Sequence, residues 1–141
     1  ERTQQLIRQL LNVWESSVRA THDFLSEEEI IKIREYVPMA IENVEHLIIA
    51  EKESGEPAAF MGIDGNRLEM LFLSPEARGK GLGKRLLQYG IETYNIQELT
   101  VNEQNPQAVG FYEHMGFQTY KRTDHDEEGN PYPLLYMRLS R

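Results

Sequence analysis

A glycine-rich segment with a dense cluster of cations contains the residues that point most directly to chemistry. Its sequence is Arg78-Gly79-Lys80-Gly81-Leu82-Gly83. Glycines let the backbone approach a ligand closely, and free N–H groups at the start of a following helix attract an anion. Arg78, Lys80, Lys84 and Arg85 lie close together with no acid among them, although the chain has a formal net charge of −8. We predict a phosphate-binding loop; the alternative is a glycine-rich turn with solvated lysines.

Two better-known phosphate-binding motifs do not fit this segment. A Walker loop needs four residues between its first glycine and Gly-Lys-Ser/Thr, whereas three residues separate Gly79 from Gly83, and Arg85 follows Lys84. A dinucleotide-binding fingerprint needs a third glycine at position 84, where a lysine stands. Both spacings disfavour a nucleotide-phosphate binder of either class.

The segment and its surroundings resemble the GNAT family of N-acetyltransferases. Arg78-x-x-Gly81-x-Gly83 is similar to the family's Gln/Arg-x-x-Gly-x-Gly/Ala signature, and residues 71–78 resemble its fourth strand and the exit from that strand. Residues 105–117 are similar to the family's Asn-x-x-Ala-x-x-Phe-Tyr…Gly-Phe segment. Residues 20–25 and 131–135 further resemble a small bacterial subgroup of the YjaB type.

This resemblance implies an enzyme that transfers an acetyl group from acetyl-CoA to a primary amine, by direct attack in a ternary complex. A backbone N–H of the fourth strand would face the thioester oxygen, because the developing oxyanion needs a donor. The alternative is a non-catalytic acyl-CoA-binding or sensing module, which keeps the loop but needs no catalytic acid. The implied cofactor-binding residues are Leu71, Phe72, Leu73, Arg78, Gly79, Lys80, Gly81, Leu82, Gly83 and Lys84.

Three side chains are candidates for proton transfer. Tyr112 is the candidate acid for the leaving thiolate, since a tyrosine with an ordinary pKa of ~10 is protonated at neutral pH; it could instead be a buried packing residue. Glu69 matches a strand position where the family often has an acid that deprotonates the amine, but it could equally face solvent. His22 is the rival base, with an ordinary pKa of ~6.5, or a polar surface residue.

Further residues are candidates for binding the two substrates. Asn105 could bind the pantetheine arm through its amide hydrogens while its side-chain oxygen caps a helix. Asn102 is a weaker cofactor candidate, with a solvated loop residue as the alternative. Trp14, Phe24 and Tyr132 could line the acceptor site, although aromatic residues at helical or strand spacing are more often part of a core.

The elements that must position these residues form one domain over residues 1–141, because domains of ~100–150 residues are typical. Apolar periodicity predicts a helix over 3–20. Ser26 and Glu29 form a capping box for a second helix, which Pro38 kinks or restarts. Asn105-Pro106 starts another helix, after one that follows the glycine-rich loop. The predicted strands are 46–51, 58–63, 67–73, 98–102, about 117–124 and 133–139.

This order of elements predicts an α/β domain with a mixed sheet. The resemblance implies a mostly antiparallel, splayed sheet flanked by about four helices. It also implies a first strand before the first helix; none is visible in the sequence, and we expect that strand upstream of Glu1.

Composition excludes several other classes of protein. The chain has no cysteine, which excludes disulfide scaffolds and thiolate chemistry. A pI near 5.0 argues against a general nucleic-acid binder, and the longest apolar runs, of four residues, are far short of the ~20 that span a membrane. The resemblance implies a monomer or homodimer that acts on a small-molecule or peptide amine, and we expect it in the cytoplasm, without a metal ion.

Overall fold

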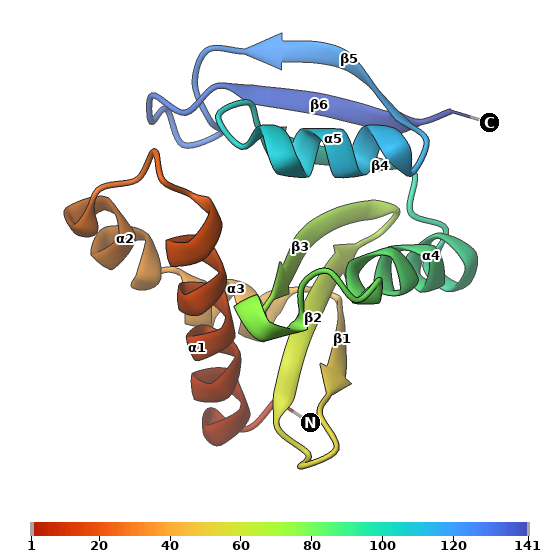
Figure 1. Cartoon of the computed structure of the whole chain (residues 1–141). Helices are drawn as coiled ribbons and strands as arrows, with labels where there is room; N and C mark the ends of the chain where they lie inside the picture. The colour runs from red at the N-terminus through yellow and green to blue at the C-terminus, as the bar shows by residue number, and fades with distance from the viewer. Residues whose placement is uncertain (1, 141) are drawn as a thin grey trace.

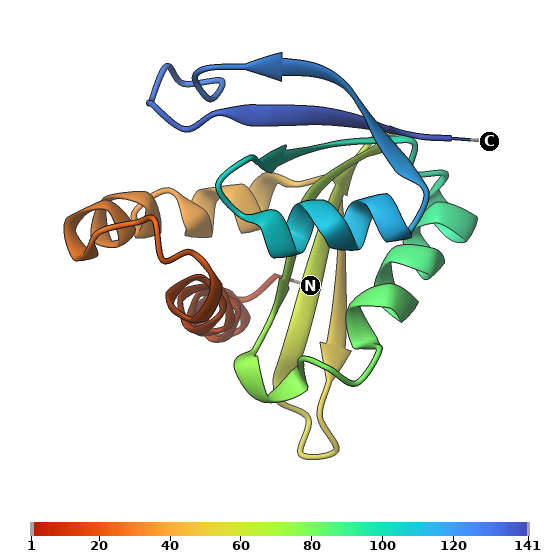
Figure 2. The ribbon, with the colours of Figure 1, turned by 45° about the horizontal axis from the view of Figure 1, so that its top comes forward.

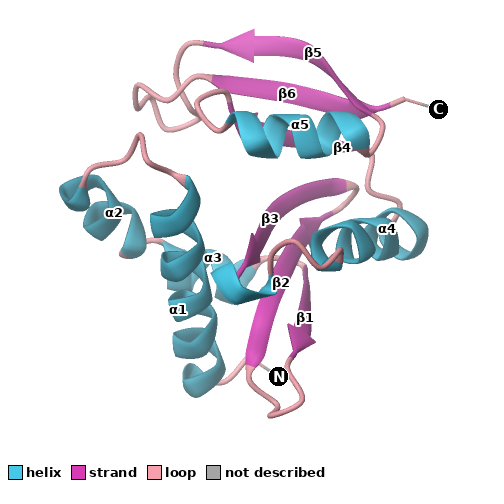
Figure 3. Ribbon diagram, viewed as in Figure 1, coloured by secondary structure: helices cyan, strands magenta, loops and turns pink. Residues whose placement is uncertain are grey.

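The computed structural model describes residues 2–140, in which five α-helices and a short 3-10 helix accompany one six-stranded sheet (Figure 1, Figure 3). The helices are α1 (Gln4–Thr21), α2 (Glu27–Arg34), α3 (Val37–Asn43), η1 (Pro75–Ala77), α4 (Leu82–Tyr94) and α5 (Pro106–His114). The strands are β1 (His46–Glu51), β2 (Pro57–Asp64), β3 (Arg67–Leu73), β4 (Glu98–Asn102), β5 (Phe117–Thr123) and β6 (Leu134–Leu139).

The helices begin where the sequence provides caps. Thr3 and Ser26 accept hydrogen bonds from the first turns of α1 and α2, and Ser26 forms the predicted capping box with Glu29. Of the two effects predicted for Pro38, the restart is confirmed and the kink is not: α2 ends at Arg34, and the proline occupies the first turn of a new helix, α3, where its missing N–H costs nothing. The described residues therefore contain one α-helix more than the four expected.

The sheet has the strand order β1-β2-β3-β4-β6-β5 and is antiparallel except between β3 and β4. These two parallel strands share only the residue pairs Arg67–Glu98 and Leu68–Leu99. Beyond them the strands separate, and Figure 2 shows β1–β3 and β4–β6 diverging. The splayed, mostly antiparallel sheet expected from the resemblance is confirmed.

A β-bulge on β3 lies next to the point of separation. Ile63 of β2 pairs with Leu68, but the preceding Gly62 pairs with Met70, which leaves Glu69 as an extra residue without a partner on β2. Such a bulge bends and twists a strand. Leu68 and Leu71 consequently pack in the same core cluster, so the regular alternation of side chains along a strand does not run through Glu69.

Helices cover both faces of the sheet. On one face, α1, α2 and α3 pack with Phe60 of β2 and Phe72 of β3. On the other face, α4 and α5 pack around Met61, Leu87 and Met137. Successive residues of β2 alternate between the two cores, as a strand that is buried on both faces requires.

Candidate active site

A cleft of about 460 Å³ opens where β3 and β4 separate. Its walls come from α1, β3, the glycine-rich loop, β4 and α5. The lining residues are Ser17, Thr21, His22, Leu68, Glu69, Met70, Leu71, Phe72, Leu73, Arg78, Gly79, Gly83, Thr100, Val101, Asn102, Asn105, Gln107, Ala108, Phe111 and Tyr112. This single cleft thus collects eleven of the predicted site residues from five different segments of the chain.

The glycine-rich loop presents an unbroken run of free backbone donors. Among the described residues, no hydrogen bond uses the N–H groups from Gly79 to Lys84, although Arg78 N donates to Pro75 O and Arg85 N donates to Gly81 O. Gly79 and Gly81 have φ values of +78° and +77°, which glycine adopts without strain. Six adjacent donors at the start of α4, whose dipole favours an anion there, fit a diphosphate.

The cations of the loop are available for the same ligand. Within residues 2–140, Arg78, Lys80, Lys84 and Arg85 form no ion pair. The guanidinium of Arg78 instead donates to Gln107 Oε1 at 2.9 Å, which fixes the loop against the start of α5. The lysine ammonium groups therefore remain free to pair with phosphate oxygens.

Tyr112 is a buried residue whose ring lies in the core and lines the cleft. The ring makes edge-on contacts with Phe111 and Phe117. Burial raises the pKa of Tyr112 above its ordinary value, so the phenol stays protonated at neutral pH. Its hydroxyl has no hydrogen-bond partner in residues 2–140, but the surrounding atoms do not enclose it completely. The hydroxyl is therefore open to a ligand in the cleft.

The two asparagines also face the cleft, each through a turn at the end of β4. Asn105 is 8% exposed, and its Oδ1 accepts from Ala108 N at 3.4 Å, as the predicted helix cap requires. The Oδ1 of Asn102 accepts from Gln104 N at 2.8 Å. In both residues the oxygen is used locally, which leaves the amide hydrogens for a ligand.

Glu69, the bulged residue of β3, lies in the cleft beside a cation that the sequence analysis did not identify. Arg67 Nε is 3.2 Å from Glu69 Oε2, and its Nη2 is 3.3 Å from Thr100 Oγ1 and 3.4 Å from Glu127 Oε2. Burial raises the pKa of Glu69 and the charge of Arg67 opposes this rise. The net direction is upward, so this carboxylate binds a proton more readily than an ordinary glutamate, although Arg67 already pairs with it.

His22 follows α1 directly and lines the cleft. Burial, and then the charge of Arg78, lower the pKa of His22 below 6.5, while Asp23 opposes the shift. The imidazole is therefore neutral at pH 7, as a base must be. Its Nδ1 lies 2.7 Å from Thr21 Oγ1.

The three aromatic residues that we assigned to the acceptor site lie in different places. Trp14 is 5% exposed in the core under α1 and does not line the cleft. Phe24 and Tyr132 lie outside the cleft but form a row of ring contacts that starts at His22. The ring centroids are 5.3 Å apart for His22–Phe24 and 6.4 Å for Phe24–Tyr132. The hydroxyl of Tyr132 donates to Glu29, so the loop before β6 contacts the start of α2.

The remaining predicted loop residues lie at or beyond the edge of the cleft. Lys80 and Leu82 line a second hollow of about 200 Å³, together with Lys52, Ser74 and Arg85. Gly81 and Lys84 line neither space, but their N–H groups belong to the free run described above. Ser17, Thr100 and Gln107 line the cleft and were missed, because no motif position marks them. Phe111 also lines the cleft and was missed, although it is the Phe of the segment matched over residues 105–117.

Residues 2–140 contain neither a helix suited to a membrane nor a cluster of metal ligands. No helix within residues 2–140 combines the length and the apolar character that crossing a membrane requires. In the same residues, no group of three or more histidine, aspartate or glutamate side chains is arranged to hold a metal ion.

Sequence comparisons identify relatives that cover most of the chain. A family model described as an acetyltransferase (GNAT) domain matches residues 14–140. The peptidyl-lysine N-acetyltransferase YjaB of Salmonella typhimurium is 40% identical over 126 residues, which are 89% of this chain and 86% of that protein. The peptidyl-lysine N-acetyltransferase YiaC of Escherichia coli is 27% identical, over 86% of this chain and 84% of that protein.

Solved structures have the same architecture. The solution structure of apo-form YjaB from Escherichia coli superposes with a TM-score of 0.86 at 36% identity, covering 95% of this chain and 90% of that one. The PaiA N-acetyltransferase of Thermoplasma acidophilum, in complex with coenzyme A, has a TM-score of 0.67 at 23% identity, with 95% and 93% covered. The second likeness concerns the fold alone.

Proposed function

Because the chain belongs to the GNAT family and is an N-acetyltransferase that uses acetyl-CoA, we propose that its acceptor is the side-chain amine of lysine in a peptide or protein. The curated relatives carry the name peptidyl-lysine N-acetyltransferase. The observation that carries the proposal for this chain is the shared cleft, in which loop residues Arg78 and Gly79 line the same space as Tyr112, Glu69 and His22.

The charge near the proposed acceptor site supports a cationic substrate. Glu69 lines the cleft itself, Glu127 reaches Arg67 beside it, and Glu29 contacts the aromatic residue Tyr132. Opposite charges attract over distances up to about a Debye length, ~8 Å at physiological salt. A protonated lysine side chain is therefore drawn towards this side of the cleft, where Phe24 and Tyr132 can contact its aliphatic stem.

We assign the steps of acetyl transfer to residues of this chain. The N–H groups of Gly79–Lys84 and the loop cations bind the diphosphate, and the amide hydrogens of Asn102 and Asn105 bind the pantetheine arm. His22 accepts a proton from the amine, since its Nε2 is neutral at pH 7 and Glu69 is already paired with Arg67. The neutral amine nitrogen then bonds to the acetyl carbon and the carbon–sulfur bond breaks, while Tyr112 donates its proton to the departing thiolate. The nitrogen loses its second proton as the amide forms, and this proton returns to the Tyr112 phenolate, directly or through solvent.

The compartment follows from the same proposal. Acetyl-CoA and lysine-bearing proteins meet in the cytoplasm, and we place the enzyme there.

A panel of acceptors tests the proposed substrate class. Release of free thiol from acetyl-CoA is followed with a peptide that contains one lysine and a blocked amino terminus, with the same peptide carrying arginine, and with an unblocked peptide without lysine. Turnover confined to the first peptide supports the proposal. Equal or faster turnover of the terminal amine would contradict it, and tight binding of acetyl-CoA without turnover of any amine would indicate a sensing module.

A further inference from the structure

Thr21 makes two short contacts at the end of α1. Its hydroxyl oxygen lies 2.8 Å from the carbonyl oxygen of Ser17, one turn earlier, and 2.7 Å from Nδ1 of His22. All three residues line the cleft. The side chain of Thr21 therefore joins the backbone of a helix to the imidazole that we assigned as the base.

The direction of these hydrogen bonds follows from counting protons. A carbonyl oxygen can only accept, so the Thr21 hydroxyl donates its one hydrogen to Ser17 O. The hydroxyl oxygen then has lone pairs but no hydrogen for His22, so Nδ1 must be the donor of the second bond. Both contacts are hydrogen bonds at the same time only when His22 carries its proton on Nδ1. In a neutral imidazole, Nε2 then holds the free lone pair.

We propose that Thr21 is a positioning residue that holds His22 in the Nδ1–H tautomer and so keeps Nε2 ready to accept a proton from the amine. The proposal rests on His22 being the base of the proposed function. The ring contact with Phe24 helps to restrain the imidazole plane. The charges nearest to His22, Arg78 and Asp23, have opposite signs and act on its pKa in opposite directions. A neutral hydroxyl orients the ring without stabilising the imidazolium as a carboxylate would.

Nitrogen-15 NMR of the free enzyme measures the tautomer directly and needs no turnover. Long-range proton–nitrogen spectra recorded at pH 8 distinguish the two ring nitrogens of His22, whose signals are assigned by their loss in His22→Gln. We expect the Nδ1–H form in the wild type and in Thr21→Ser, which keeps the hydroxyl. In Thr21→Val, which has nearly the same shape, we expect the Nε2–H form to become dominant.

Kinetics connect the tautomer to catalysis. For Thr21→Val we expect kcat on a lysine peptide to fall ~10-fold, by analogy with the 10–100-fold loss when the partner that orients a metal-binding histidine is removed. Neither the dissociation constant for coenzyme A nor the melting temperature should change, and Thr21→Ser should restore the rate.

Three results would overturn the proposal. An Nε2–H tautomer in the wild type, or an unchanged Nδ1–H tautomer in Thr21→Val, would show that Thr21 does not set the proton position. A shifted tautomer with an unchanged kcat would show that His22 is not the base. Each of these leaves acetyl transfer by the wild type intact, whereas failure of the proposed function would appear as a wild type that acetylates no lysine peptide.

Discussion

Burial of Tyr112 affects its chemistry in two opposing ways. The raised pKa keeps the phenol protonated, but it also makes the proton harder to release, since a free thiol has a pKa of ~8.5. Transfer to the sulfur becomes favourable only if the thiolate forms in the same poorly solvated cleft, where its own pKa rises as well. The position of Tyr112 in the lining of the cleft satisfies this requirement.

Tyr112→Phe removes only the hydroxyl and should separate chemistry from binding. We expect kcat to fall by ~10²–10⁴, the usual contribution of a general acid. The dissociation constant for coenzyme A, measured by calorimetry, should stay within about twofold. Tyr89→Phe, at an exposed position on α4, is the matched control. A wild-type rate in Tyr112→Phe would remove this residue from the mechanism and leave the binding loop unaffected.

The pH dependence of kcat/KM identifies the base. The active forms are the neutral imidazole and the ionised carboxylate, so the rate falls as the pH drops through the pKa of whichever group is the base. The pKa of His22 is lowered from 6.5 and that of Glu69 is raised from 4.5. The acidic limb therefore lies below pH 6.5 if His22 is the base, and above pH 4.5 if Glu69 is the base.

We expect the acidic limb to disappear in His22→Gln and to persist in Glu69→Gln. Glu69→Gln should instead raise KM for the lysine peptide, because it removes negative charge beside the acceptor. The reverse pattern, with the limb lost only in Glu69→Gln, would assign the proton transfer to Glu69.

At the scale of elements, the turn before α4 determines whether the loop amides face a ligand. Gly81 initiates α4 in a left-handed conformation, with φ +77°. In Gly81→Ala this conformation costs about 1 kcal/mol. We expect the free loop to relax away from it, so that binding must restore it and coenzyme A binds ~5-fold more weakly in calorimetry.

Gly65→Ala provides a matched control for the loop substitution. Gly65 has a similar φ of +60° in the β2–β3 hairpin and does not line the cleft. Gly65→Ala should lower the stability of the fold by a comparable amount without changing the dissociation constant for coenzyme A. If the two variants bind coenzyme A equally well, the loop amides are not the diphosphate site.

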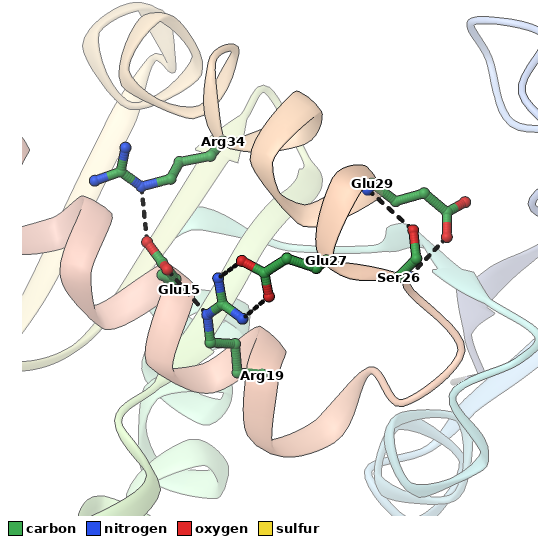
Figure 4. A network of polar contacts seen from close by, with 6 residues as sticks. All are labelled: Glu15, Arg19, Ser26, Glu27, Glu29 and Arg34. Atoms are coloured by element: carbon green, nitrogen blue, oxygen red, sulfur yellow. Dashed lines mark hydrogen bonds and ion pairs between the residues drawn. The ribbon is translucent and has the colours of Figure 1, made fainter.

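A polar network between α1 and α2 fixes the ends of the loop that carries His22 and Phe24. Arg19 donates to Glu15 at 2.9 Å and to Glu27 at 2.6 and 2.8 Å, and Arg34 donates to Glu15 at 2.7 Å (Figure 4). The bonds from Arg19 lower the pKa values of Glu15 and Glu27.

These lowered pKa values imply a pH-dependent contribution to stability. A carboxylate whose folded pKa lies below its unfolded value of about 4.5 stabilises the fold above that pH, and the effect is lost as the pH falls through the folded pKa. In Arg19→Met we therefore expect a lower melting temperature at pH 7 and an unchanged one at pH 2. Arg8→Met, at an exposed position of α1, is the control; equal effects of the two substitutions at pH 7 would contradict a role for the network.

The elements themselves could be predicted from local sequence, whereas the exceptions depend on contacts between distant segments. The strands over 46–51, 67–73 and 98–102 and the caps Ser26 and Asn105 were predicted correctly, because alternation and capping depend on neighbouring residues. The bulge at Glu69 was not, since it depends on how β3 pairs with β2. Ser17 and Gln107 were missed for a related reason: they enter the cleft only through the packing of α1 and α5 around the sheet.

At the scale of the whole molecule, the cleft is a consequence of the sheet topology. β3 and β4 are the parallel pair in an otherwise antiparallel sheet, and they pair over two residues only. Each half of the sheet keeps its own antiparallel partners, so the halves can separate without losing their ladders. The opened strand edges then offer backbone donors and acceptors to an extended ligand, as in strand addition.

A crystal structure of the enzyme with coenzyme A tests this account most directly. We predict that the diphosphate lies on the N–H groups of Gly79–Lys84, that the pantetheine arm lies between β3 and β4, and that the sulfur is within hydrogen-bond distance of the Tyr112 hydroxyl. Coenzyme A bound outside this cleft, or bound in it with the sulfur remote from Tyr112, would contradict the account.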